Sequence, residues 1–191
     1  MRRLFKQKNK EKGFTILETM VSVSLFIVVV IVGMGSLLNT TLLHKKSQSI
    51  GSIMDNLSFI IEDMSRNLRT GYDYHCIIND ADIVTTDTKD CLVGKGVSFK
   101  SSLGNQWIYL ISTNGDIQKS IDGGLTFTIL TPPEIKIDSA LQFFVSGALP
   151  PPQDTRQPFV TIRLIGSITS QGNVEPFSLQ TSVSSRLVDI N

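Results

Sequence analysis

The feature that most constrains this chain is a long segment without charged side chains near its N-terminus. Residues 19–43 contain no Asp, Glu, Lys, Arg or His. As an α-helix they would extend about 37 Å, and the hydrocarbon core of a bilayer is about 30 Å thick. The segment therefore predicts a helix that spans a membrane once, which we place at residues 14–43.

The charge distribution predicts the orientation of this helix. Basic residues cluster in residues 1–13 against the single acid Glu11, whereas the rest of the chain is net acidic; the basic residues are Arg2, Arg3, Lys6, Lys8, Lys10 and Lys12. Because clustered Lys and Arg stay on the cytoplasmic side, we expect a cytoplasmic N-terminus and a body outside. A net acidic body does not directly indicate nucleic acid as a partner, since nucleic-acid binding requires cationic side chains that neutralise the phosphates.

The apolar segment differs from an ordinary secretory signal. Such a signal has an apolar core of about 7–15 residues followed by a small-x-small cleavage site, and this chain has a longer core and no such site. Glu18 also needs an explanation, because a charge inside hydrocarbon costs at least about 2.5 kcal/mol. A simple single-pass anchor is one alternative, but it gives Glu18 no role.

The stretch KGFTILETMVSVSLFIVVVIVG, residues 12–33, resembles the N-terminal signature of type IV prepilins and type II secretion pseudopilins. The resemblance lies in a short basic leader that ends in Gly, then Phe, then Glu at the fifth position of an apolar helix. It implies that a prepilin peptidase removes residues 1–13 between Gly13 and Phe14 and methylates the new amine of Phe14. The implied partners are other pilin or pseudopilin subunits, this peptidase, an inner-membrane assembly platform and membrane lipid.

The resemblance also implies a role for Glu18 in assembly. In the filaments of that family this carboxylate faces the cationic N-terminus of a neighbouring subunit, so two buried charges become one pair. Phe14 and Glu18 are separated by four residues, so the pair can also close within one chain. Both arrangements agree with the sequence.

Beyond residue 43 the helix is expected to continue as an amphipathic half over residues 44–70. Apolar residues recur at spacings of three and four, which predicts one buried stripe on a soluble head. Gly71 is expected to end the helix. The stripe consists of Ile50, Ile53, Leu57, Ile60 or Ile61, Met64 and Leu68.

From Val97 onward, β-branched and aromatic runs separated by turn residues predict strands. Residues 97–191 are expected to form an antiparallel sheet of about five to seven strands. The fold class predicted for the chain is therefore α+β, with a long N-terminal helix packed on an antiparallel β-sheet, as in pilins. The ending FSLQTSVSSRLV, residues 177–188, also resembles the last strand of minor pilins and pseudopilins.

Residues 71–96 are expected to be a connecting loop that contains both cysteines, Cys76 and Cys91. In an exported protein such a pair favours a disulfide, with free thiols as the alternative. A thiol activated by His75 is a weaker alternative. Acidic residues in this segment suggest either a solvated loop or a Ca²⁺ site, but the Gly and terminal Glu of an EF-hand loop are missing. These acids are Asp80, Asp82, Asp87 and Asp90.

No arrangement of residues in the sequence indicates catalysis, a cofactor or a metal site. We therefore expect a non-enzymatic subunit of a type IV pilus-like filament, and a minor subunit because the strand-rich head is large. It would be inserted in the cytoplasmic membrane and then assembled into an extracellular or periplasmic filament. The alternatives are a type II secretion pseudopilin and a single-pass receptor or adhesin that does not polymerise. Adhesion, motility, DNA uptake and secretion are all roles open to such a filament.

Overall fold

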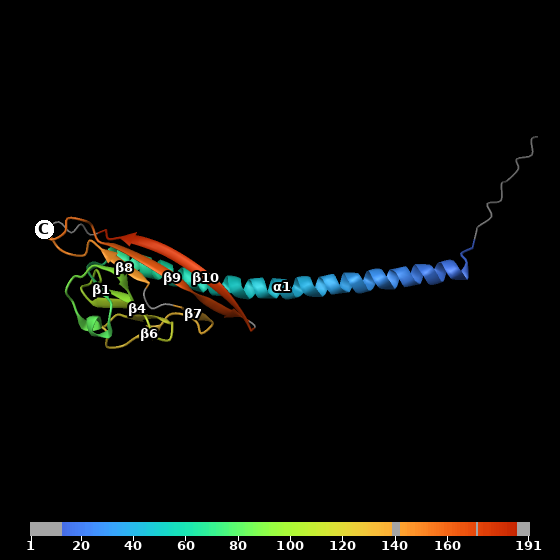
Figure 1. Ribbon diagram of the computed structural model, residues 1–191, viewed down its shortest axis with the longest axis horizontal. Coiled ribbons are helices and arrows are strands. Elements are labelled where there is room, and N and C mark those ends of the chain that lie inside the picture. Colours follow the sequence, from blue (N-terminus) through green and yellow to red (C-terminus); the bar gives the residue numbers. More distant parts are fainter. Residues whose placement is uncertain (1–12, 139–141, 171, 187–191) are drawn as a thin grey trace, which may run out of the picture. The chain divides into compact units, whose positions relative to one another are not determined.

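The computed structural model describes residues 13–138, 142–170 and 172–186, and the chain divides into two compact units, Met1–Lys45 and Lys46–Asn191. The leader expected at residues 1–13 lies outside the described residues except for Gly13. Helix α1 runs from Ile16 to Thr70, so it begins two residues later than expected and ends where expected (Figure 1).

The second half of α1 carries the buried stripe that the spacing predicts. Five of its apolar residues are buried, whereas Ile50 is half-buried at the end of the stripe. Ile60, and not Ile61, occupies the inward position. The buried residues are Ile53, Leu57, Ile60, Met64 and Leu68. The prediction of an amphipathic half-helix that serves the core of the head is confirmed.

The first sheet of the head is antiparallel and has the strand order β1-β3-β4-β5-β6. Its strands are β1 (Tyr72–Ile77), β3 (Gly96–Lys100), β4 (Gln106–Ile111), β5 (Ile117–Ser120) and β6 (Thr128–Ile129). A short 3₁₀ helix, η1 (Asp80–Val84), follows β1.

The second sheet, also antiparallel, has the order β10-β9-β8-β2, and β7 pairs with a separate part of β9. Its strands are β2 (Cys91–Gly94), β7 (Ile135–Ile137), β8 (Phe143–Ser146), β9 (Phe159–Ser170) and β10 (Asn173–Ser184). The long β9–β10 hairpin runs alongside the last part of α1 (Figure 1), where Ser49 and Ser170 share a hydrogen bond of 2.8 Å.

The α+β class is confirmed: a long N-terminal helix packs on antiparallel sheet. The expectation of one sheet is wrong, because the strands form two separate sheets. Residues 71–96, expected to be a connecting loop, contain β1, η1 and β2. The last four residues of β1 are all buried, so the strand lacks the alternation that marks a half-buried strand. Strand β2 is only four residues long and pairs with the distant β8.

One apolar core joins the helix and both sheets. One buried cluster contains side chains from all three: Leu57 and Met64 of α1, Phe99 and Tyr109 of the first sheet, and Ile162 of the second sheet. The ring of Phe99 lies between those of Tyr74 and Tyr109, with centroids 6.0 Å away on each side. Because all three layers bury side chains in one place, the head folds as a single unit.

A polar network holds α1 against the first sheet. The carboxylate of Asp63 accepts hydrogen bonds of 3.0 Å from Lys119 Nζ and from Tyr109 Oη. Asn67, one turn further along α1, donates to the same Tyr109 oxygen at 2.7 Å. The ammonium of Lys119 also lies 4.6 Å from the centroid of the Trp107 ring. This network could not be predicted from local sequence patterns, because its residues come from elements far apart in the chain.

Strand β10 is an edge of the second sheet, since it pairs only with β9. It pairs along twelve residues, and its outward-facing side chains are largely exposed. Pro176 lies within this strand, opposite Ser167 of β9. Proline is compatible with this position because an edge strand has one side without a hydrogen-bonded neighbour.

Candidate functional site

The first turn of α1 contains the residues that the sequence marks for processing and assembly. Gly13, Phe14 and Thr15 precede the helix. The carbonyl of Thr15 accepts the first helical hydrogen bond, from Thr19 N at 3.2 Å, and its hydroxyl accepts from Glu18 N at 3.3 Å. Thr15 is therefore the N-cap of α1, and Glu18 is the third helical residue.

This cap was missed in the sequence, although a signal for it was present. Thr15 and Glu18 fit the Ser/Thr-x-x-Glu pattern of a capping box. A carboxylate in the first turn is also stabilised by the positive end of the helix dipole. Glu18 is exposed and takes part in none of the ion pairs found among residues 13–138, 142–170 and 172–186.

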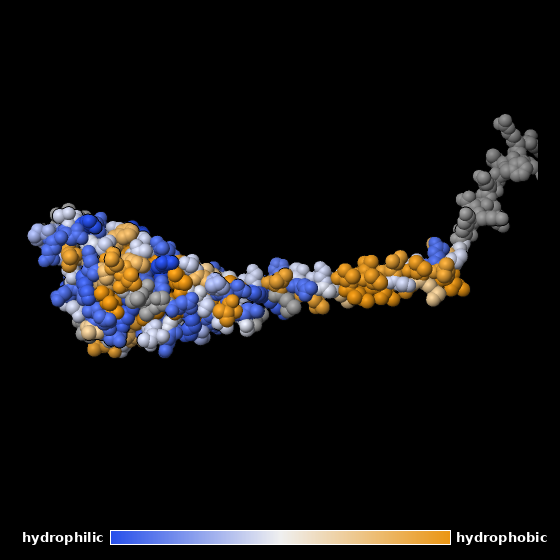
Figure 2. All heavy atoms as spheres, in the orientation of Figure 1, coloured by the Kyte–Doolittle hydropathy of each residue, from blue (hydrophilic) through white to orange (hydrophobic). Residues whose placement is uncertain are grey.

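The apolar side chains of the first half of α1 are exposed. Phe14 is 79% exposed, and comparable values continue as far as Leu38. Figure 2 shows this part of the helix as an almost continuous apolar surface. Among the described residues one helix, α1, is long and apolar enough to cross a membrane. Such a surface needs lipid or protein around it.

Hydroxyl groups interrupt the apolar surface, but five of them have hydrogen-bond partners within the helix. Each of the five donates to a carbonyl three or four residues earlier, at 2.5 to 2.9 Å. The donors are Thr19, Ser22, Ser24, Thr40 and Thr41. These hydroxyl groups therefore do not require water, which makes the segment compatible with a lipid environment.

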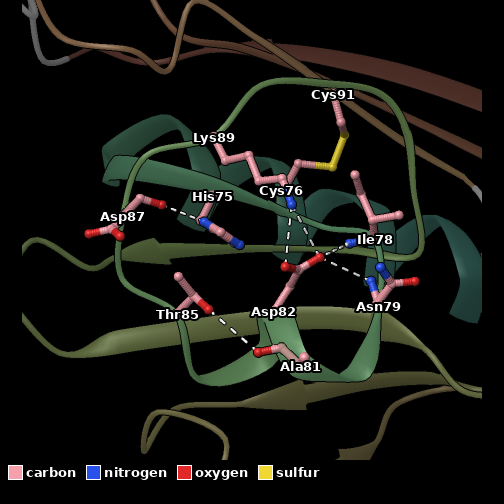
Figure 3. A network of polar contacts seen from close by, with 10 residues as sticks. All are labelled: His75, Cys76, Ile78, Asn79, Ala81, Asp82, Thr85, Asp87, Lys89 and Cys91. Carbon is pink, nitrogen blue, oxygen red and sulfur yellow. Dashed lines mark hydrogen bonds and ion pairs between the residues drawn. A yellow bond between two sulfur atoms is a disulfide. The ribbon is translucent and has the colours of Figure 1, made fainter.

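The two cysteines form a disulfide, with Cα atoms 5.9 Å apart, which confirms the predicted pair (Figure 3). Cys76 lies in β1 and Cys91 begins β2, so the bond joins the two sheets. The alternative of a thiol activated by His75 is wrong for this state, because the sulfur of Cys76 is already bonded. His75 is buried, and its Nδ1 contacts the carbonyl oxygen of Asp87.

The segment between the cysteines is held by its acidic residues. The carboxylate of Asp82 accepts from the backbone N–H groups of Ile78 and Asn79 and lies 3.3 Å from Lys89 Nζ (Figure 3). The two backbone hydrogen bonds, followed by the Lys89 contact, hold the pKa of Asp82 below its usual value.

The other acids of this segment point to different partners. Asp80 pairs with Lys95, and the Asp90 carboxylate accepts from the backbone N–H groups of Gly147 and Ala148. Within the described part of the chain, no three His, Cys, Asp or Glu side chains are grouped as they would be around a metal ion. Asp80 and Asp87 are exposed, as expected for a solvated loop, whereas Asp82 and Asp90 are held by backbone hydrogen bonds.

Comparison of the chain with protein-family models, with curated proteins and with solved structures gives no match. Function is therefore inferred from the residues themselves.

Proposed function

We propose that the chain is a membrane-inserted subunit of a type IV pilus-like filament. A prepilin peptidase removes the basic leader between Gly13 and Phe14, and the first half of α1 then mediates polymerisation. The head lies on the outer side of the cytoplasmic membrane before assembly. The strand-rich head favours a minor subunit, and a type II secretion pseudopilin is the nearest alternative.

The observation that carries the proposal is the combination of exposed apolar side chains and one unpaired carboxylate in the same part of α1. Most apolar side chains from Phe14 to Leu38 are exposed in the described part of the chain. Glu18 has no cationic partner among the described residues. A bundle of such helices would bury the apolar surface and would then require a positive charge beside each Glu18.

Cleavage after Gly13 supplies that charge. The new α-amine of Phe14 stands next to the N-terminal end of α1, where the helix dipole disfavours a cation. Placing it against the Glu18 carboxylate of a neighbouring subunit offsets both this repulsion and the cost of removing the two charges from water. Subunit addition and charge neutralisation are thereby coupled.

The test compares Glu18→Ala with Asp55→Ala, which removes another exposed acidic residue of α1. Membrane insertion should be preserved in both variants. For Glu18→Ala, the ratio of protein in sheared filaments to protein in membranes should fall at least tenfold. The reason is that removing one partner of a buried ion pair leaves the other charge unpaired, which destabilises the assembly by about 3–5 kcal/mol. Asp55→Ala should keep the wild-type ratio.

Two further outcomes have defined meanings. Glu18→Gln should behave like Glu18→Ala, because it retains the shape of the side chain but not its charge. A wild-type ratio for Glu18→Ala, in a strain that assembles filaments, would contradict the proposal and would favour a single-pass receptor or adhesin.

A further inference from the structure

The outer face of the second sheet carries an apolar groove that the helix-based assembly does not use. Side chains alternate along β9: Val160, Ile162 and Leu164 point into the core, so Thr161 and Arg163 point to the opposite face. On that face lies a groove of about 420 Å³, which residues of β2, β8, β9 and β10 line.

The floor and walls of this groove are more apolar than an ordinary solvent-facing surface. Leu92 of β2 is 86% exposed and Phe159 of β9 is 42% exposed, and the half-buried Phe144 of β8 lies beside them. Cys91, one of the two disulfide-bonded cysteines, also lines the groove. Contiguous exposed apolar side chains of this kind mark interaction sites.

The charge at the groove specifies what would bind there. Arg163 is the one charged residue among the side chains that line it. No ion pair within the described parts of the chain involves Arg163. A guanidinium beside an apolar surface favours a partner that combines an apolar side chain with a carboxylate, because a bidentate pair satisfies its fixed donors.

We propose that this groove binds a segment of a neighbouring filament subunit in which an apolar side chain lies next to an Asp or Glu. The apolar side chain would cover Leu92 and Phe159, and the carboxylate would pair with Arg163. The inference rests on the proposed function, because the partner is another subunit of the same filament. It adds a contact between heads to the contact between helices.

The experiment uses the full chain in cells that assemble the filament. A photoactivatable benzoylphenylalanine replaces Leu92, and in a control chain it replaces Leu103, which is 84% exposed in the turn between β3 and β4. After illumination, sheared filaments are analysed for cross-linked pairs, and the cross-linked peptide is identified by mass spectrometry. The Leu92 position should give at least fivefold more cross-linked subunit pair than the Leu103 position, through a peptide that contains Asp or Glu.

Charge variants test the role of Arg163 separately. Arg163→Glu should reduce the cross-link from position 92 at least fivefold, whereas Arg163→Lys should retain most of it. Arg156→Glu, which reverses an exposed charge outside the groove lining, should leave it unchanged. All of these chains keep Glu18, so their presence in sheared filaments reports on the proposed function independently.

The outcomes separate the two proposals. Two outcomes overturn the groove assignment alone. In the first, the chain enters filaments normally but position 92 gives no excess cross-link; in the second, the cross-link survives Arg163→Glu. A cross-link to lipid or to a small apolar molecule also overturns it. Absence of the wild-type chain from filaments overturns the proposed function and the groove assignment together.

Discussion

Thr15 sets the start of α1, and with it the position of the proposed cleavage bond. Its hydroxyl caps the helix at Glu18 N, so the bond between Gly13 and Phe14 lies in non-helical backbone. A peptide bond outside the helix does not have to be unwound before a peptidase can reach it. The residues proposed for processing, Gly13 and Phe14, are therefore adjacent to Thr15, the residue that caps the start of the helix.

Processing gives the first prediction. Mature protein should begin at Phe14, and its intact mass should be lower than that of the full chain by the thirteen-residue leader. Gly13→Leu should leave the precursor uncleaved in the membrane. Among the described residues, chain neighbours aside, no atom lies within 4 Å of a Cβ placed at Gly13, so the defect would not come from a clash there. Gly33→Leu, an equally open position, serves as the control and should be cleaved normally. Retention of Met1 in a strain with active peptidase would contradict this prediction.

Asp63 gives a prediction on pH. Burial raises the pKa of Asp63, but the hydrogen bonds from Lys119 and Tyr109 and the Lys119 charge outweigh it, so the pKa lies below the usual 3.8. A carboxyl group whose folded-state pKa is depressed stabilises the fold above its unfolded pKa, and this stability is lost as the pH falls through the folded value.

Asp63→Asn should accordingly lower the unfolding free energy of the head by about 1–2 kcal/mol at pH 7. This value lies at the low end for hydrogen bonds to charged groups, because a third of the Asp63 side chain is exposed to solvent. The difference from wild type should begin to shrink below about pH 4, where the carboxyl group of the unfolded chain binds a proton, and should disappear as the pH falls through the lower folded-state pKa. Thermal unfolding of the full chain in detergent between pH 3 and 7 measures it. A difference that stays constant over this range would contradict the assignment.

At the scale of elements, α1 is a single helix whose two halves have different surroundings. Its first half exposes apolar side chains all round, whereas its second half buries one stripe. Both halves could be predicted, because each depends on local spacing and charge. The residue after the helix, Gly71, was also predicted, but for a different reason from the one that the structure gives.

Gly71 is required by packing. A Cβ at this position would lie 2.3 Å from Cδ2 of Phe99, which belongs to the buried aromatic stack. Gly71→Ala should therefore destabilise the head by about 1–3 kcal/mol through overpacking. Gly51→Ala, within α1 and with nothing near its Cβ, should instead stabilise by about 0.5–1 kcal/mol. Denaturant unfolding followed by the fluorescence of Trp107, the single tryptophan, measures both. Equal effects of the two substitutions would exclude the packing argument.

The arrangement of β1 and β2 could not be predicted, for physical reasons. Strand β1 is buried on both faces near its end, so it has no two-residue period. Strand β2 is stabilised by β8 and by the disulfide, and both contacts depend on residues that the local sequence does not reveal. The polar network at Asp63 and the groove beside Arg163 were missed for the same reason, since each forms only after distant strands come together.

At the scale of the whole molecule, the disulfide is the covalent link between the two sheets of the head. Replacing both cysteines with serine, Cys76→Ser and Cys91→Ser, should lower the unfolding free energy by about 3 kcal/mol, as expected for a closed loop of about 15 residues. Non-reducing peptide mapping should find the Cys76–Cys91 pair in exported protein. A reductant should lower the stability of the wild type but not that of the double variant, and an equal response of both would contradict this account.

The fold class and the division into an apolar half-helix and a soluble head were predictable from the sequence alone. They depend on average properties of long segments, which tolerate local exceptions. The residues proposed for processing and assembly were likewise visible, because they occupy one short stretch with fixed spacing. The surface that would contact a neighbouring head was not visible, since four strands from separate parts of the chain compose it.

Pro176 has a consequence for how such a subunit would associate. The free edge of β10 is long enough to recruit a strand from another molecule, and a protein that gathers at high local density in a membrane would be exposed to that error. Proline has no N–H to donate, so a run of hydrogen bonds across this edge is interrupted at the fourth of the twelve residues of β10. Growth by indiscriminate sheet extension, as in amyloid, is thereby discouraged, and ordered association is left to the helix and to side-chain contacts.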